Sequence, residues 1–543
     1  MIARLDKILT IGFCLLWAVF IFIDYLYYHP NYAVSLEYFQ YFDTVIILSL
    51  IGAAVYWVIN IKKLDVFLNY LTNGVGLYLL FMLTCAVIIW THYAKISQET
   101  LDFLSGLTYL GKISAILLAC YFMVAVNYVL GDFIFNKFFS VSFKASVTRL
   151  VKLGLGITLY CLFFTIIAAL GLFKMYVILP LLILILAIGW KAAIAFIKAT
   201  LLKPLIAPQE LNVIGFTSFF IVLIFVSLNV LANVRPFPFG FDALALYLNV
   251  PNLISQQGAL IDGFSPYYWS IFMASGQTAF NMVEMSIALS AGGGILSLFA
   301  IYEITRKWLD VNFSFLITLL FYSLPLINYQ SFRDAKIDLG LLFTLSIAFL
   351  VLIRWLSLEN KEAFVKKIIP ESKQKKKIIK GKNKSKNVQT EVVVRKEGFL
   401  ANKVSASNQL IIILGILTGL ALGIKLTALL FIFAVLTVFS FVKGGTIGFV
   451  ANFALTIFII LIGELDTSLR AYHFGVANLQ WVMLLLGLIS LGYVWYTKRQ
   501  QFISLISIAA IYIAFIALIY APWPIKNYAE TGTFSIETIT GAR

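Results

Sequence analysis

Residues 153–190 read LGLGITLYCLFFTIIAALGLFKMYVILPLLILILAIGW and carry one charged side chain, Lys174, between two apolar runs. Each run approaches the roughly 20 apolar residues with which an α-helix crosses the hydrocarbon core of a bilayer. The pattern extends over the whole chain of 543 residues, of which 61% are hydrophobic and 12% are charged. A soluble globular chain has roughly 45 to 50% apolar and about 25% charged residues. We therefore expect an all-α membrane protein.

Apolar runs of roughly 17 to 25 residues recur along the chain and predict about fifteen transmembrane helices. The expected spans lie near residues 8–28, 44–61, 71–93, 108–130, 153–173, 176–197, 211–232, 280–304, 312–329, 337–357, 408–423, 427–442, 445–464, 475–496 and 502–521. The first run follows Arg4 and Lys7 as a signal peptide would, but it is too long and lacks a small-x-small cleavage site. We interpret it as a signal anchor.

The distribution of Lys and Arg predicts the orientation, because cytoplasmic loops of membrane proteins are enriched in these residues. If the amino terminus is cytoplasmic, one side collects Lys62, Lys63, Lys137, Lys144, Arg149, Lys152, Lys198, Lys203, Arg306, Lys307, Lys443, Lys498 and Arg499. The other side receives Lys95, Lys112 and Lys174. We expect a multi-pass protein of the inner (cytoplasmic) membrane, with a cytoplasmic amino terminus and, for an odd number of spans, an extracytoplasmic carboxyl terminus.

Much of the net charge of +16 lies in one hydrophilic segment, residues 359–403, which contains KQKKKIIKGKNKSK. This local charge does not indicate nucleic-acid binding, and the lysine-rich segment is expected to be disordered. It is either a solvated linker or a segment that adheres to anionic lipid headgroups. We divide the chain into an N-terminal membrane module of about six helices, a core, a basic cytoplasmic linker and a C-terminal group of helices with an outer tail. Their bounds are 1–210, 211–357, 358–407 and 408–543.

Four cysteines fall inside apolar runs and form no CxxC pair, so we expect them to pack as small hydrophobic residues rather than to bind metal. They are Cys14, Cys85, Cys120 and Cys161.

The segment 233–279 is too long for a simple connection, and the topology places it outside the bilayer on the extracytoplasmic side. Pro236 and Pro238 halt the preceding helix. The apolar residues from Leu244 to Val250 predict a short interfacial helix with its apolar side toward lipid. Asp242 lies at the start of this helix. It is either the N-cap of the helix or a functional carboxylate, because an acidic side chain at the membrane surface is costly unless it is solvated, paired or part of a functional site.

Four motifs stand out in the chain after residue 230. The loop 233–279 has the pattern formed by Asp242, Ala243, Leu244, Leu248, Pro251, Gly258, Pro266, Ser270 and Phe272. The others are the dipeptide Asp338-Leu339, the run G-x-x-x-G-x-A-x-G-x-K-x-T from Gly415 to Thr427, and P-W-x-I-K-N-x-x-x-T-G from Pro522 to Gly532. Together these motifs resemble those of bacterial GT-C class glycosyltransferases, membrane enzymes that take a sugar from a polyprenyl-phosphate carrier. The matches cover roughly residues 230–535 and imply a GT-C-like bundle with a structured first large extracytoplasmic loop.

The resemblance implies that Asp242 is the general base that deprotonates the acceptor hydroxyl, a role worth roughly 10² to 10⁴ in rate. The donor would be a polyprenyl-phosphate-linked sugar, whose phosphate is held by cations near the outer face. The implied substrate-binding residues are Arg235, Tyr247, Arg333, Lys336, Asp338, Lys425 and Lys526. No metal ligands are assigned, and a divalent cation stays open as a cofactor.

Each of these assignments has a structural alternative. Lys425 can instead extend its ammonium group to the membrane interface. Lys526 can anchor the last helix beside Trp523. The charged residues of the sequence RDAKID, residues 333–338, can form ion pairs with one another. The sequence also departs from the family pattern, with Leu246 and Tyr247 in place of a tyrosine-histidine pair, Met273 in place of a proline and Gln277 in place of a glutamate.

Two other functions stay open at this point. A flippase for lipid-linked saccharides, or another transporter, needs as many helices, and transporters tend to show broken helices and ionisable groups at the midplane. A noncatalytic relative that acts in envelope assembly is the third interpretation, and the lost histidine and glutamate positions favour it.

Overall fold

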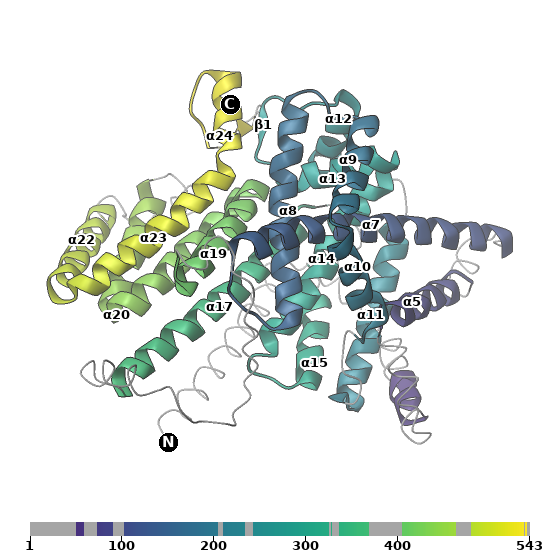
Figure 1. The fold of residues 1–543 in the computed structure, drawn as a ribbon, viewed down its shortest axis with the longest axis horizontal. Helices are drawn as coiled ribbons and strands as arrows, with labels where there is room; N and C mark the ends of the chain where they lie inside the picture. Colours follow the sequence, from purple (N-terminus) through teal and green to yellow (C-terminus); the bar gives the residue numbers. More distant parts are fainter. Residues whose placement is uncertain are drawn as a thin grey trace.

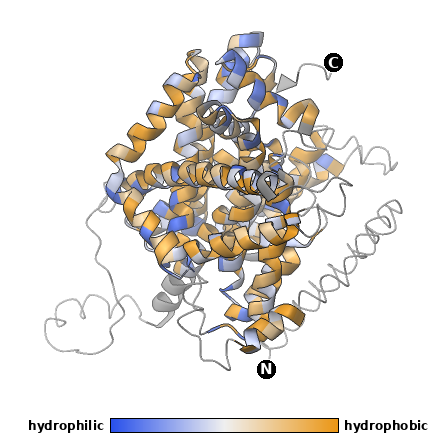
Figure 2. Ribbon diagram, turned by 90° about the vertical axis from the view of Figure 1, so that its right-hand side faces the viewer, coloured by the Kyte–Doolittle hydropathy of each residue, from blue (hydrophilic) through white to orange (hydrophobic). Residues whose placement is uncertain are grey.

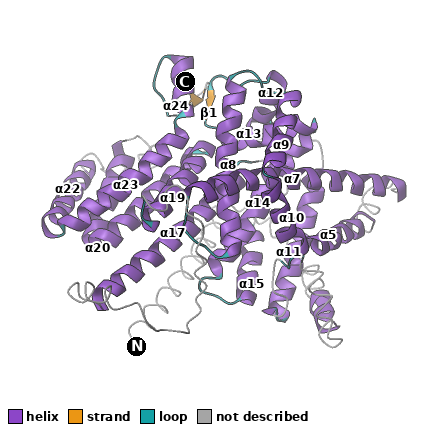
Figure 3. Cartoon of the chain, in the orientation of Figure 1, coloured by secondary structure: helices purple, strands orange, loops and turns teal. Residues whose placement is uncertain are grey.

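The fold is described from a computed structural model, which defines residues 50–58, 73–90, 103–204, 210–233, 243–324, 327, 336–368, 404–462, 479–536 and 538–539. Helices account for nearly all of this part of the chain (Figure 3). Hydrophobic residues line most of the helices (Figure 2). Within the described ranges, nine helices are long and apolar enough to cross a membrane. The chain is thus an all-α, multi-pass membrane protein.

The nine helices are α7 (Phe103–Phe138), α8 (Ala145–Ala169), α11 (Val213–Asn233), α14 (Val283–Thr305), α17 (Asp338–Ile368), α19 (Ala406–Ile424), α20 (Leu429–Ile462), α22 (Leu479–Thr497) and α23 (Arg499–Tyr520). Shorter helices are α5 (Gly74–Ile88), α12 (Asn249–Gln257), α13 (Tyr268–Phe280), α15 (Val311–Tyr322) and α24 (Pro522–Thr531). Figure 1 labels these elements. The number of fifteen spans stays a prediction, because the first expected span and part of the second lie outside the described residues.

The expected span 176–197 is broken. It consists of α9 (Met175–Ile188) and the segment Trp190–Leu202, which begins with α10 (Trp190–Ile197), and the two parts are bent by 83° at the break. If the bent pair counts as one span and α20 is counted once, the described residues have ten elements long and apolar enough to cross a membrane.

Helix α20 turns back on itself, which accounts for two of the expected spans, 427–442 and 445–464. Gly445 leaves helical geometry with φ 69° and ψ −157°. The amide nitrogen of Asn452 donates to the hydroxyl of Thr437 at 2.7 Å, although fifteen residues of continuous helix would separate them by about 22 Å. The two arms are therefore antiparallel, and the turn between them is a glycine because a positive φ costs glycine nothing.

The helices alternate in direction, and contacts between distant residues define two ends of the bundle. At the basic end, Lys144 at the start of α8 pairs with Glu303 near the end of α14, with 3.4 Å between Nζ and Oε2. At the loop end, the Lys174 ammonium donates to the carbonyl of Gln256, and the Tyr268 hydroxyl donates to the carbonyl of Ile519. These contacts agree with the sides expected from the distribution of Lys and Arg.

Helix α13 differs from expectation, because the whole segment 233–279 was expected outside the bilayer. Nearly every residue of α13 is buried. The Cys161 thiol donates to the carbonyl of Tyr268, and the neighbouring Tyr160 hydroxyl donates to Ser275, whereas Phe280 contacts Phe122 of α7. The helix therefore crosses α8 inside the bundle, about 13 Å from the end of α8 at the rise of a helix.

The expected interfacial helix exists as a helical turn, Ala243–Tyr247, followed by α12. Its apolar side was expected to face lipid, but most of it faces the protein. Leu248, Val250 and Ile254 are buried, whereas Leu244 is exposed. The helix is thus attached to the bundle by its apolar face rather than lying free in lipid.

Candidate functional site

The loop end of the bundle is built from two segments that lie far apart in the sequence. Strand β1 (Phe264–Ser265) pairs antiparallel with β2 (Thr538–Ile539). The Ser265 hydroxyl donates to the side-chain oxygen of Asn527 at 2.7 Å, and Asn527 in turn donates to the carbonyl of Ser535. The rings of Tyr267 and Trp523 pack at a centroid distance of 4.5 Å. The segment before α13 and the segment that follows α23 therefore form one cap at one end of the bundle, where Figure 1 shows α24 beside β1.

An ion pair lies at this end between two of the predicted site residues. Helix α17 begins at Asp338, and α19 ends at Ile424, so that Lys425 follows in an extended conformation. The ammonium Nζ of Lys425 lies 2.7 Å from Oδ1 of Asp338, and the two side chains are 32% and 27% exposed. The Asp-Leu dipeptide and the glycine-rich run therefore meet in space, 87 residues apart in the sequence.

Tyr247 and Lys336 act electrostatically on the same ammonium group. Partial burial by itself lowers the pKa of Lys425, and the charge of Lys336 acts in the same direction. The hydrogen bond and charge of Asp338, together with the effect of Tyr247, outweigh both and raise this pKa above its ordinary value of 10.5. Lys425 is therefore cationic throughout the physiological pH range. We call Tyr247, Lys336, Asp338 and Lys425 the loop-end cluster.

The glycines before Lys425 let α19 pack closely on its neighbours. A Cβ added at Gly419 would lie 2.8 Å from Cβ of Ile519, and one at Gly423 would lie 2.1 Å from the ring of Tyr268. A spacing of four residues places these glycines on one face of the helix. The nearby Trp523 ring packs on Tyr268 at 4.8 Å, so the motif that begins at Pro522 also reaches the end of α19.

Lys526 does not join the loop-end cluster. Its side chain is buried, forms an ion pair with Glu530 and donates to the carbonyl of Phe264 at 3.3 Å. The ammonium group also lies 5.9 Å from the ring centroid of Tyr267. These contacts join α24 to β1, which agrees with the anchoring interpretation of this residue.

Gln277, which replaces the glutamate of the family pattern, is a buried structural residue. Its amide nitrogen donates to Asn252 at 2.5 Å, and its oxygen accepts from Ser286 at 2.9 Å. An ionised carboxylate accepts hydrogen bonds only and could not supply the donor. The glutamine thus links α12, α13 and α14 through one donated and one accepted hydrogen bond.

Three predicted site residues, Asp242, Arg235 and Arg333, lie outside the residues that the structure describes. Among the residues with defined positions, no group of three or more His, Cys, Asp and Glu side chains could hold a metal ion.

Sequence reasoning missed two ion pairs between membrane-spanning helices, one of them largely buried. Nζ of Lys152 lies 2.5 Å from Oδ1 of Asp132, with the lysine side chain only 5% exposed, and Lys112 pairs with Glu284 at 2.5 Å. The isolated charges at positions 132 and 284 in apolar surroundings are the signal that could have indicated them, because an unpaired charge in such a place is costly.

Comparison with known proteins gives no relative, since no family model, no curated protein and no solved structure matches the chain.

Proposed function

We propose that the chain is a membrane glycosyltransferase that moves a sugar from a polyprenyl-phosphate carrier to an acceptor on the extracytoplasmic side of the cytoplasmic membrane. The observation that carries the proposal is the pair of Asp338 and Lys425 at the loop end. The two residues come from separate motifs of the GT-C resemblance, 87 residues apart in the sequence.

The geometry of the cluster suits a phosphorylated lipid. Lys425 is half-buried and keeps its positive charge, and Asp338 holds its ammonium group in place. Lys336 adds a second cation nearby. Lysine binds phosphate as a point charge, and the contact is stronger where water is partly excluded. In this proposal Lys425 and Lys336 bind the phosphate, and Asp242 takes the proton of the acceptor hydroxyl.

The sidedness of the reaction follows from the positive-inside rule. Lys144, Lys307, Arg354 and Lys443 lie at the end opposite the loop-end cluster. In our proposal this basic end faces the cytoplasm, and the cap of α12, β1 and α24 faces the outside, with the amino terminus cytoplasmic and the carboxyl terminus outside.

The test is the substitution Asp242→Asn, with Asp262→Asn, a carboxylate of the same loop, as its matched control. The purified variants are incubated with a polyprenyl-phosphate sugar and acceptor extracts, and the transferred sugar is measured. We expect Asp242→Asn to abolish transfer while expression and thermal unfolding stay at wild-type values, and Asp262→Asn to keep transfer. Full activity of Asp242→Asn would remove this residue from the mechanism.

Mass spectrometry of lipid that copurifies with the wild-type protein tests the donor class separately. A bound polyprenyl-phosphate sugar is the expected result, and it would also identify the sugar. If no polyprenyl phosphate copurifies with the protein or binds when added, the substrate class is wrong.

One observation favours the second candidate, a flippase for the same lipid-linked saccharide. The span formed by α9 and the segment Trp190–Leu202 is bent by 83°, and broken helices are typical of transporters. The Lys152–Asp132 pair gives less support, because Lys152 lies seven residues after the start of α8, about 10 Å along the helix rather than at the midplane. Translocation of a labelled lipid-linked saccharide in proteoliposomes, without a covalent product, would favour this candidate over the transferase.

A further inference from the structure

A small pocket lies at the basic end of the bundle, opposite the loop-end cluster. It has a volume of about 140 Å³ and is lined by residues from three separate parts of the chain. Ser142, Phe143 and Lys144 precede α8, Lys307 follows α14, and Leu350 and Arg354 lie on α17. We call it the basic pocket.

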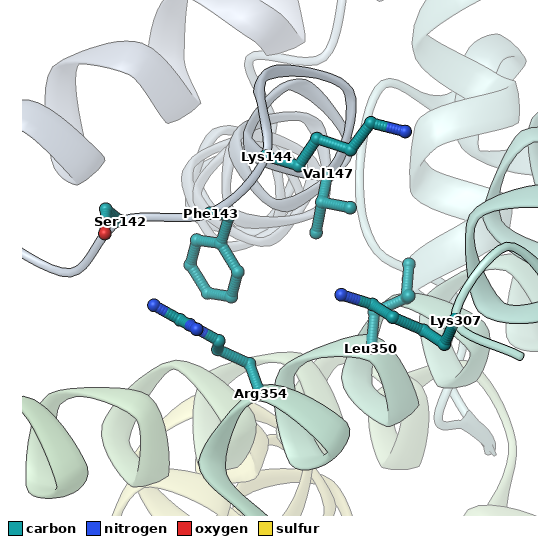
Figure 4. A pocket seen from close by; sticks show the side chains of 7 residues that line it. All are labelled: Ser142, Phe143, Lys144, Val147, Lys307, Leu350 and Arg354. Carbon is teal, nitrogen blue, oxygen red and sulfur yellow. The ribbon is translucent and has the colours of Figure 1, made fainter. Parts of the chain in front are cut away.

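Two of its three cations have no acidic partner among the described residues. Lys144 pairs with Glu303 at 3.4 Å, but no carboxylate with a defined position forms an ion pair with Lys307 or Arg354. Figure 4 shows the ammonium group of Lys307 and the guanidinium of Arg354 directed into the space beside Phe143, while the ammonium group of Lys144 points away from Arg354. Like charges placed together without a counter-ion favour the binding of an anion.

The start of α8 adds to this positive potential. The helix has 25 residues, no acidic residue in its first turn and no side-chain hydrogen bond at its N-cap, Lys144. The amino terminus of a helix carries a partial positive charge and unpaired backbone N–H groups, which favour a phosphate or carboxylate. This effect is independent of the two side-chain charges of Lys307 and Arg354.

The surroundings of the basic pocket indicate the level of lipid headgroups. Trp308, directly after Lys307, is 68% exposed, and Phe313 in the first turn of α15 is 50% exposed. Exposed tryptophan beside lysine at the end of a spanning helix is typical of the membrane interface. The apolar residues Phe143 and Leu350 on the wall of the pocket suit the part of a lipid that lies next to its phosphate.

We propose that the basic pocket binds the phosphate group of an anionic phospholipid in the leaflet at this end. Basic pockets between membrane helices are suited to such headgroups, and the arginine can contact two phosphate oxygens at once. The proposal is independent of the proposed transferase activity, because it concerns the opposite end of the bundle and uses none of the residues of the loop-end cluster.

The test compares the full-length protein with the variant Lys307→Gln/Arg354→Gln in nanodiscs of phosphatidylcholine alone or of equal parts phosphatidylcholine and phosphatidylglycerol. Native mass spectrometry counts the retained phosphatidylglycerol molecules. We expect the wild type to retain phosphatidylglycerol, and the double variant to bind it about thirtyfold more weakly because two phosphate contacts are lost. The matched control is Lys198→Gln/Lys203→Gln, which removes two exposed lysines outside the basic pocket and should bind as the wild type does.

A second variant separates charge from folding. The exchange Lys307→Arg/Arg354→Lys keeps both charges and should keep most of the binding. If the first double variant retains phosphatidylglycerol as well as the wild type does, or if the wild type retains none, the proposal is wrong.

Inorganic phosphate distinguishes the two sources of the anion. Added phosphate should stabilise the wild type in phosphatidylcholine nanodiscs less than phosphatidylglycerol does, if the lipid is the ligand. Equal stabilisation by phosphate, lost in Lys307→Gln/Arg354→Gln, would keep the pocket as a phosphate site but assign it to a soluble phosphate.

Discussion

Replacing Lys425 by Met separates the structural role of the loop-end ion pair from its proposed role in binding. The pair has an N···O distance of 2.7 Å, and its side chains are 32% and 27% exposed. Exposed ion pairs contribute about 0.2 to 1 kcal/mol and hydrogen bonds to charged groups about 1.5 to 3 kcal/mol. A partly buried pair lies between these ranges, so Lys425→Met should lower the free energy of unfolding by about 1 to 2 kcal/mol.

Binding responds differently if Lys425 holds a phosphate. The loss of one charged contact should weaken the binding of a polyprenyl phosphate about 10- to 100-fold, measured with a fluorescent polyprenyl phosphate and detergent-purified protein. Asp338→Asn breaks the same ion pair but leaves the cation, so it should lose similar stability and weaken the binding less than Lys425→Met does. Lys174→Met is the matched control, because this lysine lies at the same end and binds a backbone carbonyl.

The decisive comparison is between Lys425→Met and Asp338→Asn. If both variants lose stability but bind the polyprenyl phosphate as the wild type does, the ion pair is structural and the assignment of Lys425 is refuted.

The pH dependence of stability gives an independent check on the pair. The pKa of Lys425 is raised above its ordinary value of 10.5 in the folded protein, so the stabilisation is complete below that value and is lost as the pH rises through the raised pKa. The difference in thermal stability between the wild type and Lys425→Met should therefore be constant from about pH 7 to about pH 10 and decrease at higher pH.

Two further substitutions test the packing of the bundle by thermal unfolding in detergent. Gly423→Ala places a methyl group 2.1 Å from the ring of Tyr268 and should lower the free energy of unfolding by about 1 to 3 kcal/mol. The control Gly492→Ala has open space around the added methyl group and should lower it by nothing. Equal effects of the two substitutions would contradict the packing. Lys152→Met leaves Asp132, whose side chain is 22% exposed, without its partner and should cost about 3 kcal/mol, the lower limit for a buried pair. The double variant Lys152→Met/Asp132→Asn should restore most of this loss, and an equally unstable double variant would contradict the pairing.

The sequence predicted an all-α membrane protein, because burial in lipid makes each span a continuous apolar run, whereas the number of fifteen spans stays a prediction. The position of the turn in α20 was predicted between residues 442 and 445, where the structure has Gly445. Likewise, Lys144 and Lys174 lie at opposite ends of the bundle, as the distribution of basic residues predicts.

The sequence could not predict which polar residues meet. The contacts of Lys425 with Asp338 and of Lys526 with β1 depend on how helices pack, and apolar runs do not specify that packing. Helix α13 was missed for a related reason. Its 13 residues are too few for a span, and its polar residues Ser275 and Gln277 resemble those of a loop until the structure shows their partners in α8, α12 and α14.

The cap at the loop end has a consequence for biosynthesis. The hydroxyl of Ser265 takes its partner from Asn527, 262 residues later in the chain, and the hydroxyl of Tyr268 takes its partner from Ile519. While the ribosome is still producing the intervening spans, these two groups have no such acceptors, although α13 has already been synthesised. This end can therefore take its final form only after the helix that ends at Tyr520 and the segment through Asn527 have been synthesised.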